Sequence, residues 1–146
     1  ICNKNGDCFS AAIASVLEVG LDEVPKLDLE ELLGTKVGNK WYSSRQTSII
    51  EWLAQKGYVI LEIHNRNGEG LDNINFGLIS VLETHCLCSV MSQAFPGCTH
   101  SIVGKFIKDA DGGVNIIQAH DPNPNNKPYE NLYKNALFFE FLIKVK

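Results

Sequence analysis

The sequence predicts one α+β domain in which N-terminal helices pack on an antiparallel sheet formed by the rest of the chain. Two observations lead to this prediction. Apolar residues recur at helical spacing up to residue 56, whereas from residue 58 onward short β-rich segments alternate with turns that contain Gly, Pro or Asn. Helices followed by strands with short connections are typical of α+β folds. The 146 residues, 45% of them hydrophobic, suffice for one core, so residues 1–146 are expected to form a single domain.

The first helix is expected to follow the turn Asn5-Gly6, with Asp7 as its N-cap. Its apolar positions are spaced to form one buried face, and they are Phe9, Ile13, Val16 and Leu17. Gly20 lies in the stretch that ends this helix.

Two further helices are expected before the sheet. A short one covers Asp28–Leu33, and a longer one covers Arg45–Lys56, with Ser44 as its cap and Gly57 just after its last turn. The segment Thr35–Trp41 between them is expected to be a loop because it contains Gly38 and Asn39.

Five segments have the composition of strands. They are Tyr58–Ile63, Cys86–Met91, His100–Ile107, Val114–Ala119 and Ala136–Val145. The turn Asp109–Gly113 is expected to join the third and fourth of these in a hairpin. Asn65–Gly70 and Asp121–Pro128 are expected to be loops, and Leu71–Glu83 is ambiguous and compatible with a short helix.

Charge and hydropathy exclude two classes of partner. The net charge is −4 and no basic run is present, which argues against nucleic acid. No apolar stretch approaches the roughly 20 residues of a membrane span, so no membrane association is expected. The chain starts at Ile1 without an initiator methionine, so we expect upstream residues to have been removed. The sequence leaves the oligomeric state open.

The five cysteines do not resemble a disulfide framework. They are Cys2, Cys8, Cys86, Cys88 and Cys98. Their odd number favours a reducing compartment, with most of them acting as small buried apolar residues. Cys86 and Cys88 share one face of a strand and are expected in the core. The spacing of the Cys and His residues does not match paired zinc ligands, and Asp109–Gly113 lacks the later ligands of a calcium loop, so no metal or cofactor is expected.

Three residues have the types and the spacing required for nucleophilic catalysis by a thiol. Cys8 lies on the first turn of a helix, where the helix dipole favours the thiolate although the neighbouring Asp7 opposes it. His100 begins one strand of the predicted hairpin, and Asp121 follows the end of the other, so their side chains would meet at one end of the sheet. A thiolate attacks a carbonyl, a histidine moves the proton, and a third residue orients the imidazole. His120 and Asn123 are alternatives to Asp121.

Three segments resemble the papain-like cysteine peptidase superfamily, and in particular its small bacterial and phage-encoded members related to peptidases that trim double-glycine leaders. The segments are GDCFSAAIASVLEV (Gly6–Val19), HSIVG (His100–Gly104) and HDPNP (His120–Pro124). The resemblance implies a papain-like fold and a thiol-dependent peptidase or amidase that acts on a peptide or protein through an acyl-enzyme. It also implies a bacterial or phage-encoded cytoplasmic protein with Cys8 as nucleophile, His100 as general base and acid, and Asp121 as the orienting residue.

The chain departs from this superfamily in one respect. Its members usually carry an oxyanion-hole glutamine shortly before the cysteine, whereas no glutamine occurs between Ile1 and Cys8. Asn3 or Asn5 could donate instead, together with the Cys8 backbone N–H, or the glutamine could lie upstream of Ile1. The alternative function is therefore a catalytically impaired papain-like domain that binds another protein.

Overall fold

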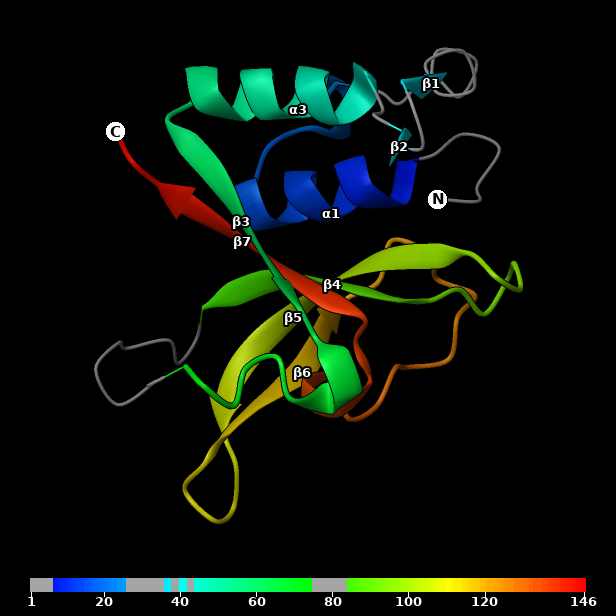
Figure 1. Ribbon diagram of the computed structural model, residues 1–146, viewed down its shortest axis with the longest axis vertical. Helices are drawn as coiled ribbons and strands as arrows, with labels where there is room; N and C mark the ends of the chain where they lie inside the picture. The colour runs from blue at the N-terminus through cyan, green and yellow to red at the C-terminus, as the bar shows by residue number, and fades with distance from the viewer. Residues whose placement is uncertain (1–6, 26–35, 38–39, 42–43, 75–83) are drawn as a thin grey trace.

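A computed structural model describes residues 7–25, 36–37, 40–41, 44–74 and 84–146, and it has an α+β fold with helices packed on a five-stranded antiparallel sheet (Figure 1). The predicted fold class is thus confirmed. The helix expected over Asp28–Leu33 lies outside the described residues. Within the described part of the chain, no helix combines the length and the apolar character needed to cross a bilayer.

Two helices cover one side of the sheet. Helix α1 spans Asp7–Leu17 and helix α3 spans Ser44–Gln55. Gly57 follows α3 with a φ of 84°, as expected for a residue that ends a helix in the left-handed conformation. The prediction that Asp7 is the N-cap of α1 is wrong, because Asp7 is itself the first helical residue. Its carboxylate lies in the first turn instead, where the helix dipole favours negative charge.

All five predicted strands are present, with ends shifted by one or two residues. They are β3 (Tyr58–His64), β4 (His85–Met91), β5 (Thr99–Lys108), β6 (Val114–His120) and β7 (Phe138–Lys144). Their order in the sheet is β3-β7-β4-β5-β6, and each neighbouring pair is antiparallel. The C-terminal strand β7 therefore lies between β3 and β4. The hairpin β5–β6 lies at the opposite edge of the sheet from β3.

The loop expected over Thr35–Trp41 is a wrong prediction. The structure has two short strands there, β1 (Lys36–Val37) and β2 (Lys40–Trp41), which pair antiparallel with each other. Strands of two residues are too short to show the alternation of side chains on which a strand prediction depends.

Several short helical turns were also not predicted. The 3₁₀ turns η1 (Leu21–Glu23) and η2 (Arg66–Gly68) lie in stretches with the composition of loops, and the one-turn helix α4 spans Leu132–Asn135. His64, which lies between the predicted strand Tyr58–Ile63 and the predicted loop Asn65–Gly70, is the last residue of β3. Of the ambiguous segment Leu71–Glu83, residues 71–74 form turns and bends, and residues 75–83 lie outside the described part.

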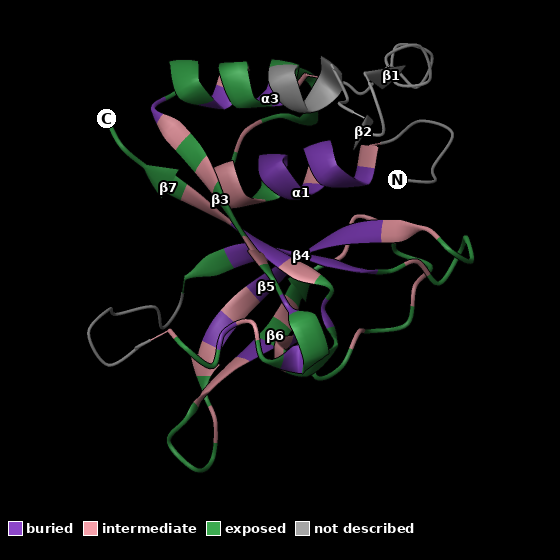
Figure 2. Cartoon of the chain, in the orientation of Figure 1, coloured by how far each residue is buried: buried purple, intermediate pink, exposed green. Residues whose placement is uncertain are grey.

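Buried residues are concentrated in α1 and in the central strands of the sheet (Figure 2), and the buried apolar side chains form two clusters, one on each face. On one face, α1 and α3 pack against Leu87 and Val103. On the opposite face the largest buried residues are Phe106 and Phe139, together with Leu132 of α4. The first of these two clusters fixes α1 against the centre of the sheet, which determines where the N-terminal end of α1 meets β5.

The cysteines follow the sequence prediction only in part. Cys86 and Cys88 are 1% and 0% exposed and their sulfurs lie 3.8 Å apart, which confirms that they belong to the core. Cys8 also has a free thiol. Cys98, in contrast, is disulfide-bonded, which the odd cysteine count did not predict. A reducing compartment was expected because the cysteines were predicted to be reduced. The disulfide at Cys98 therefore weakens that expectation.

Gly104 is a position where the sheet tolerates no side chain. A Cβ atom on Gly104 would lie 2.7 Å from both Cys88 Sγ and Ile116 Cγ2. Because both neighbours are buried, we expect Gly104→Ala to lower the free energy of unfolding by about 1–3 kcal/mol. Chemical denaturation measures this change. The double variant Gly104→Ala/Cys88→Ala should recover part of the loss because it removes one of the two clashing atoms, and a loss that is the same with and without Cys88 would contradict this explanation.

Candidate active site

Cys8 lies in the first turn of α1, at the end of the helix that meets β5. Only 5% of the residue is exposed. The next residue, Phe9, belongs to the apolar cluster beneath α1 and α3, and the Ser10 hydroxyl donates to the Pro25 carbonyl oxygen at 3.1 Å. These contacts on both sides of the helix orient its first turn and therefore the thiol.

His100 and Asp121 meet at one end of the β5–β6 hairpin. His100 is the second residue of β5, and Asp121 comes directly after β6. The imidazole Nε2 donates to Asp121 Oδ1 at 2.6 Å, and the two side chains are only 10% and 7% exposed. The hairpin that the sequence predicted is confirmed, and it brings these two residues together across 21 positions of the chain.

The Cys8 thiol and the His100 imidazole influence each other's protonation. Burial of Cys8 opposes ionisation, but the hydrogen bond with His100, backbone hydrogen bonds from Ser101 and Phe9, and the charge of His100 hold the pKa of the thiol below its ordinary value. For His100, burial disfavours the charged form, but hydrogen bonds to Cys8 and Asp121 and the charges of both residues raise its pKa. Both shifts favour a thiolate–imidazolium pair.

The two nitrogens of His100 therefore have different partners. Since Nε2 bonds to Asp121, the hydrogen bond to Cys8 is left to Nδ1. Asp121 fixes the ring with one nitrogen toward the carboxylate and the other toward the sulfur, which is the arrangement needed for proton transfer between thiol and imidazole.

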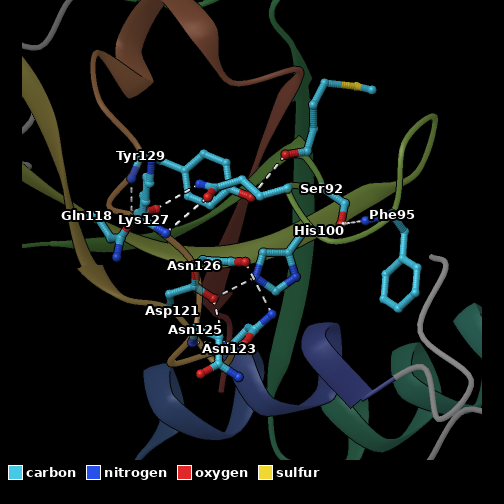
Figure 3. Close-up of polar contacts among 12 residues, drawn as sticks. Ser92, Phe95, His100, Gln118, Asp121, Asn123, Asn125, Asn126, Lys127 and Tyr129 are labelled. Carbon is cyan, nitrogen blue, oxygen red and sulfur yellow. Dashed lines mark hydrogen bonds and ion pairs between the residues drawn. The ribbon is translucent and has the colours of Figure 1, made fainter.

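The carboxylate of Asp121 is held in place by its own loop (Figure 3). Asn126 Nδ2 donates to Oδ2 at 3.0 Å, and the backbone N–H of Asn123 donates to Oδ1 at 2.8 Å. Asn123 Nδ2 in turn donates to Asn126 Oδ1 at 3.2 Å. The alternatives considered for Asp121 have other positions, since His120 is exposed at the end of β6 and Asn123 contacts the carboxylate through its backbone.

The residues that anchor this loop to the sheet were not predicted from the sequence. The Gln93 side chain donates to the Lys127 carbonyl oxygen at 2.7 Å and accepts the Lys127 N–H at 3.0 Å. The Tyr129 hydroxyl donates to the Met91 carbonyl oxygen at 3.0 Å, and its ring lies 6.3 Å from that of His100, centre to centre. The Asn-rich composition of residues 123–126 was the one local signal, because short amide side chains commonly hydrogen-bond within their own loop.

A cleft of about 450 Å³ opens beside Cys8 and His100. Several side chains along it are apolar, and Asp7 adds a carboxylate next to the thiol. The residues that line it are Asp7, Cys8, Ala11, Leu21, Ser92, Ala94, Phe95, Thr99, His100, Pro122, Asn123, Pro124 and Asn126. The thiol and the imidazole therefore face a space large enough for part of a peptide.

The expected oxyanion donors Asn3 and Asn5 lie outside the described residues. The described part of the chain contributes the backbone N–H of Cys8, which has no acceptor within the helix because it belongs to the first turn of α1. A backbone N–H on the nucleophilic residue itself is a suitable donor to the charge that develops on an attacked carbonyl oxygen.

No group of three or more His, Cys, Asp or Glu side chains suited to a metal ion occurs among the described residues. The Cys8–His100–Asp121 cluster itself is bonded internally, from sulfur to imidazole to carboxylate. This arrangement is suited to nucleophilic and acid–base chemistry by the side chains themselves.

Comparison of the chain with protein-family models, with curated proteins and with solved structures finds no match. The assignment of a function therefore depends on the geometry of this site.

Proposed function

We propose that this protein is a thiol-dependent hydrolase of the papain-like type that cleaves a peptide or other amide bond through an acyl-enzyme on Cys8. The observation that supports the proposal is the continuous hydrogen-bonded series from Cys8 through His100 to Asp121 at the edge of a cleft. Helices packed on an antiparallel sheet, with the thiol on a helix and the imidazole on a strand, agree with such a fold.

The first half-reaction uses the thiolate and the protonated imidazole. The Cys8 sulfur attacks the carbonyl carbon, and the backbone N–H of Cys8 stabilises the negative charge on the oxygen. When the C–N bond breaks, His100 gives its Nδ1 proton to the leaving nitrogen, and a thioester remains on Cys8. The Asp121 carboxylate keeps the ring oriented throughout, through its bond to Nε2.

The second half-reaction returns the enzyme to its starting state. His100 Nδ1 now takes a proton from a water molecule, whose oxygen attacks the thioester carbonyl. The carbon–sulfur bond breaks, a carboxylic acid leaves, and the thiolate–imidazolium pair forms again. The lowered pKa of Cys8 makes the thiolate both a ready nucleophile and a competent leaving group.

The lining of the cleft supports a peptide or protein as the substrate. Leu21 and Phe95 are large apolar residues that are 41% and 47% exposed, and both line the cleft. Pro122 and Pro124 add a rigid apolar wall next to the Asp121 loop. Such a surface suits an extended chain with at least one apolar side chain near the bond that is cleaved.

A peptide library tests the proposal. We would incubate the wild type and Cys8→Ala with peptides from a digested proteome and identify new termini by mass spectrometry. New termini in the wild-type sample alone support the proposal. If both proteins leave the peptides intact and the wild type forms no acyl-enzyme with an activated ester, the result contradicts it and favours a protein-binding role for this domain.

A further inference from the structure

A second cavity, separate from the candidate active site, contains a buried carboxyl group to which no described residue gives a partner. Its volume is about 210 Å³. Its lining residues come from helices α1 and α3 and from the neighbouring strands β3 and β7. It is lined by Phe9, Ile49, Ile50, Ile60, Glu62 and Glu140.

Glu140 is the unusual residue in this cavity. It lies on β7 with only 6% of its surface exposed. Among the described residues, no hydrogen-bond donor or cation contacts its carboxyl group. Buried polar groups in folded proteins nearly always have a partner, and an unmatched one destabilises the fold. A carboxyl group that lines an open cavity, and for which the described residues supply no partner, therefore indicates a site for a positively charged or hydrogen-bonding group.

The charges around Glu140 indicate the sign of that group. Glu62 lies directly opposite Glu140 in the register of β3 and β7, and like charges in this arrangement repel each other. Burial, followed by the charge of Glu62, raises the pKa of Glu140 to about 7. The Cys88 thiol on β4 also interacts electrostatically with Glu140. The imidazole of His64, which is 66% exposed, lies with Nε2 2.7 Å from Glu62 Oε1 and therefore contacts Glu62 and not Glu140.

The walls of the cavity indicate the rest of the ligand. Helices α1 and α3 contribute Phe9, Ile49 and Ile50, and β3 contributes Ile60, so every lining residue other than the two glutamates is apolar. The two carboxylates that the described residues supply are too few for calcium, which takes six to eight oxygen ligands. An organic cation with an apolar stem matches both the two glutamates and the apolar side chains of the lining. At about 30 Å³ for each water-sized group, the cavity of about 210 Å³ holds roughly seven groups.

We propose that this cavity binds a primary alkylammonium group, with the ammonium between Glu140 and Glu62 and the alkyl stem against Phe9, Ile49 and Ile60. Two of the lining residues are exposed, Ile50 by 52% and the Glu62 side chain by 39%, so the cavity borders solvent where these residues lie. This chemistry is shared by small free amines and by the side chain of lysine. The site is independent of the hydrolase function proposed above.

The test uses two probes of the same length and different charge. Calorimetric titration with n-pentylammonium chloride is compared with 1-pentanol, which has the same stem and no charge. We expect the ammonium to bind more tightly. Ionised Glu140 attracts the ammonium more strongly than neutral Glu140 does, and its pKa is raised to about 7, so the affinity should be weaker near pH 6 than near pH 8, by up to about 10-fold. The affinity for pentanol should not depend on pH.

Two variants and a second observable separate the outcomes. Glu140→Gln keeps the shape of the side chain and should remove the preference for the ammonium, whereas Glu69→Gln, on an exposed turn, should leave it unchanged. In wild-type protein, NMR titration of the Glu140 carboxyl should show its pKa falling when pentylammonium saturates the site. Equal binding of both probes near pH 8, or a pKa of Glu140 that pentylammonium does not change, would overturn the proposal.

A third probe identifies the source of the amine. Nα-acetyl-lysine N-methylamide carries a butylammonium stem on a peptide backbone. If it binds with the same pH dependence as pentylammonium, the cavity accepts a lysine side chain. If only the free amine binds, the ligand is a small amine.

Discussion

Cys8→Ala is expected to reduce hydrolysis by about 10⁴-fold or more, because the acyl-enzyme cannot form without the sulfur. The fold should change little. Replacement of a cysteine by alanine removes one buried sulfur atom, and the apolar contacts of α1 are made by its neighbours Phe9, Ala12 and Ile13. The measurement is the rate of peptide cleavage, together with the free energy of unfolding of the same preparation.

The chain offers a matched control for this variant. Cys88→Ala also removes a buried thiol, but Cys88 lies in the apolar cluster on the opposite face of the sheet. We expect it to lower stability and leave cleavage at the wild-type rate per folded molecule. If Cys8→Ala and Cys88→Ala had the same effect on cleavage, Cys8 would have no special chemical role.

Asp121→Ala is expected to lower kcat/KM by at least about 10²-fold, because the imidazole loses the acceptor that orients it. It should also lower the pKa of His100, since the hydrogen bond and the charge of Asp121 both raise that pKa. A lower pKa means that the imidazole deprotonates earlier as pH rises, so the upper limit of the pH–rate profile should move to lower pH. His120→Ala, at the adjacent exposed position, is the control and should change neither quantity.

Asp121→Asn makes a sharper test of the hydrogen-bond pattern. Asn126 Nδ2 donates to Asp121 Oδ2, so an asparagine at position 121 that keeps its oxygen toward His100 would place two NH₂ groups face to face. The single variant should therefore lose about 10-fold or more in kcat/KM, as typical for positioning contacts. The double variant Asp121→Asn/Asn126→Asp restores an acceptor and should recover part of the rate. Equal rates for the single and double variants would contradict this role of Asn126.

The sequence was sufficient to predict the fold class and the large elements. The strand Tyr58–His64 and the hairpin from Thr99 to His120 are long enough for their β-rich composition and the turn at Asp109–Gly113 to identify them. The order of strands in the sheet was not predictable. The insertion of β7 between β3 and β4 depends on contacts between residues more than 40 positions apart, such as Leu87 with Glu140, and no local pattern encodes them.

The same distinction applies to the site. The pairing of His100 with Asp121 follows from the hairpin, so the sequence could anticipate it. The contacts of Gln93 with Lys127 and of Tyr129 with Met91 join segments that are 34 and 38 residues apart, and the sequence offered no reason to connect them. Glu140 lies in the strand FFEFLIK with apolar residues on both sides, and an acidic residue inside such a run is the local signal for it.

The measurement that tests the central proposal most directly is the pH dependence of Cys8 alkylation by iodoacetamide, followed by peptide mapping, in the wild type and in His100→Ala. The account predicts that wild-type Cys8 reacts with an apparent pKa below the about 8.5 of an ordinary thiol. It further predicts that this pKa rises when His100 is removed, because the imidazole no longer stabilises the thiolate. A thiol that titrates like an ordinary cysteine and is indifferent to His100 would contradict the assignment of a catalytic Cys–His pair.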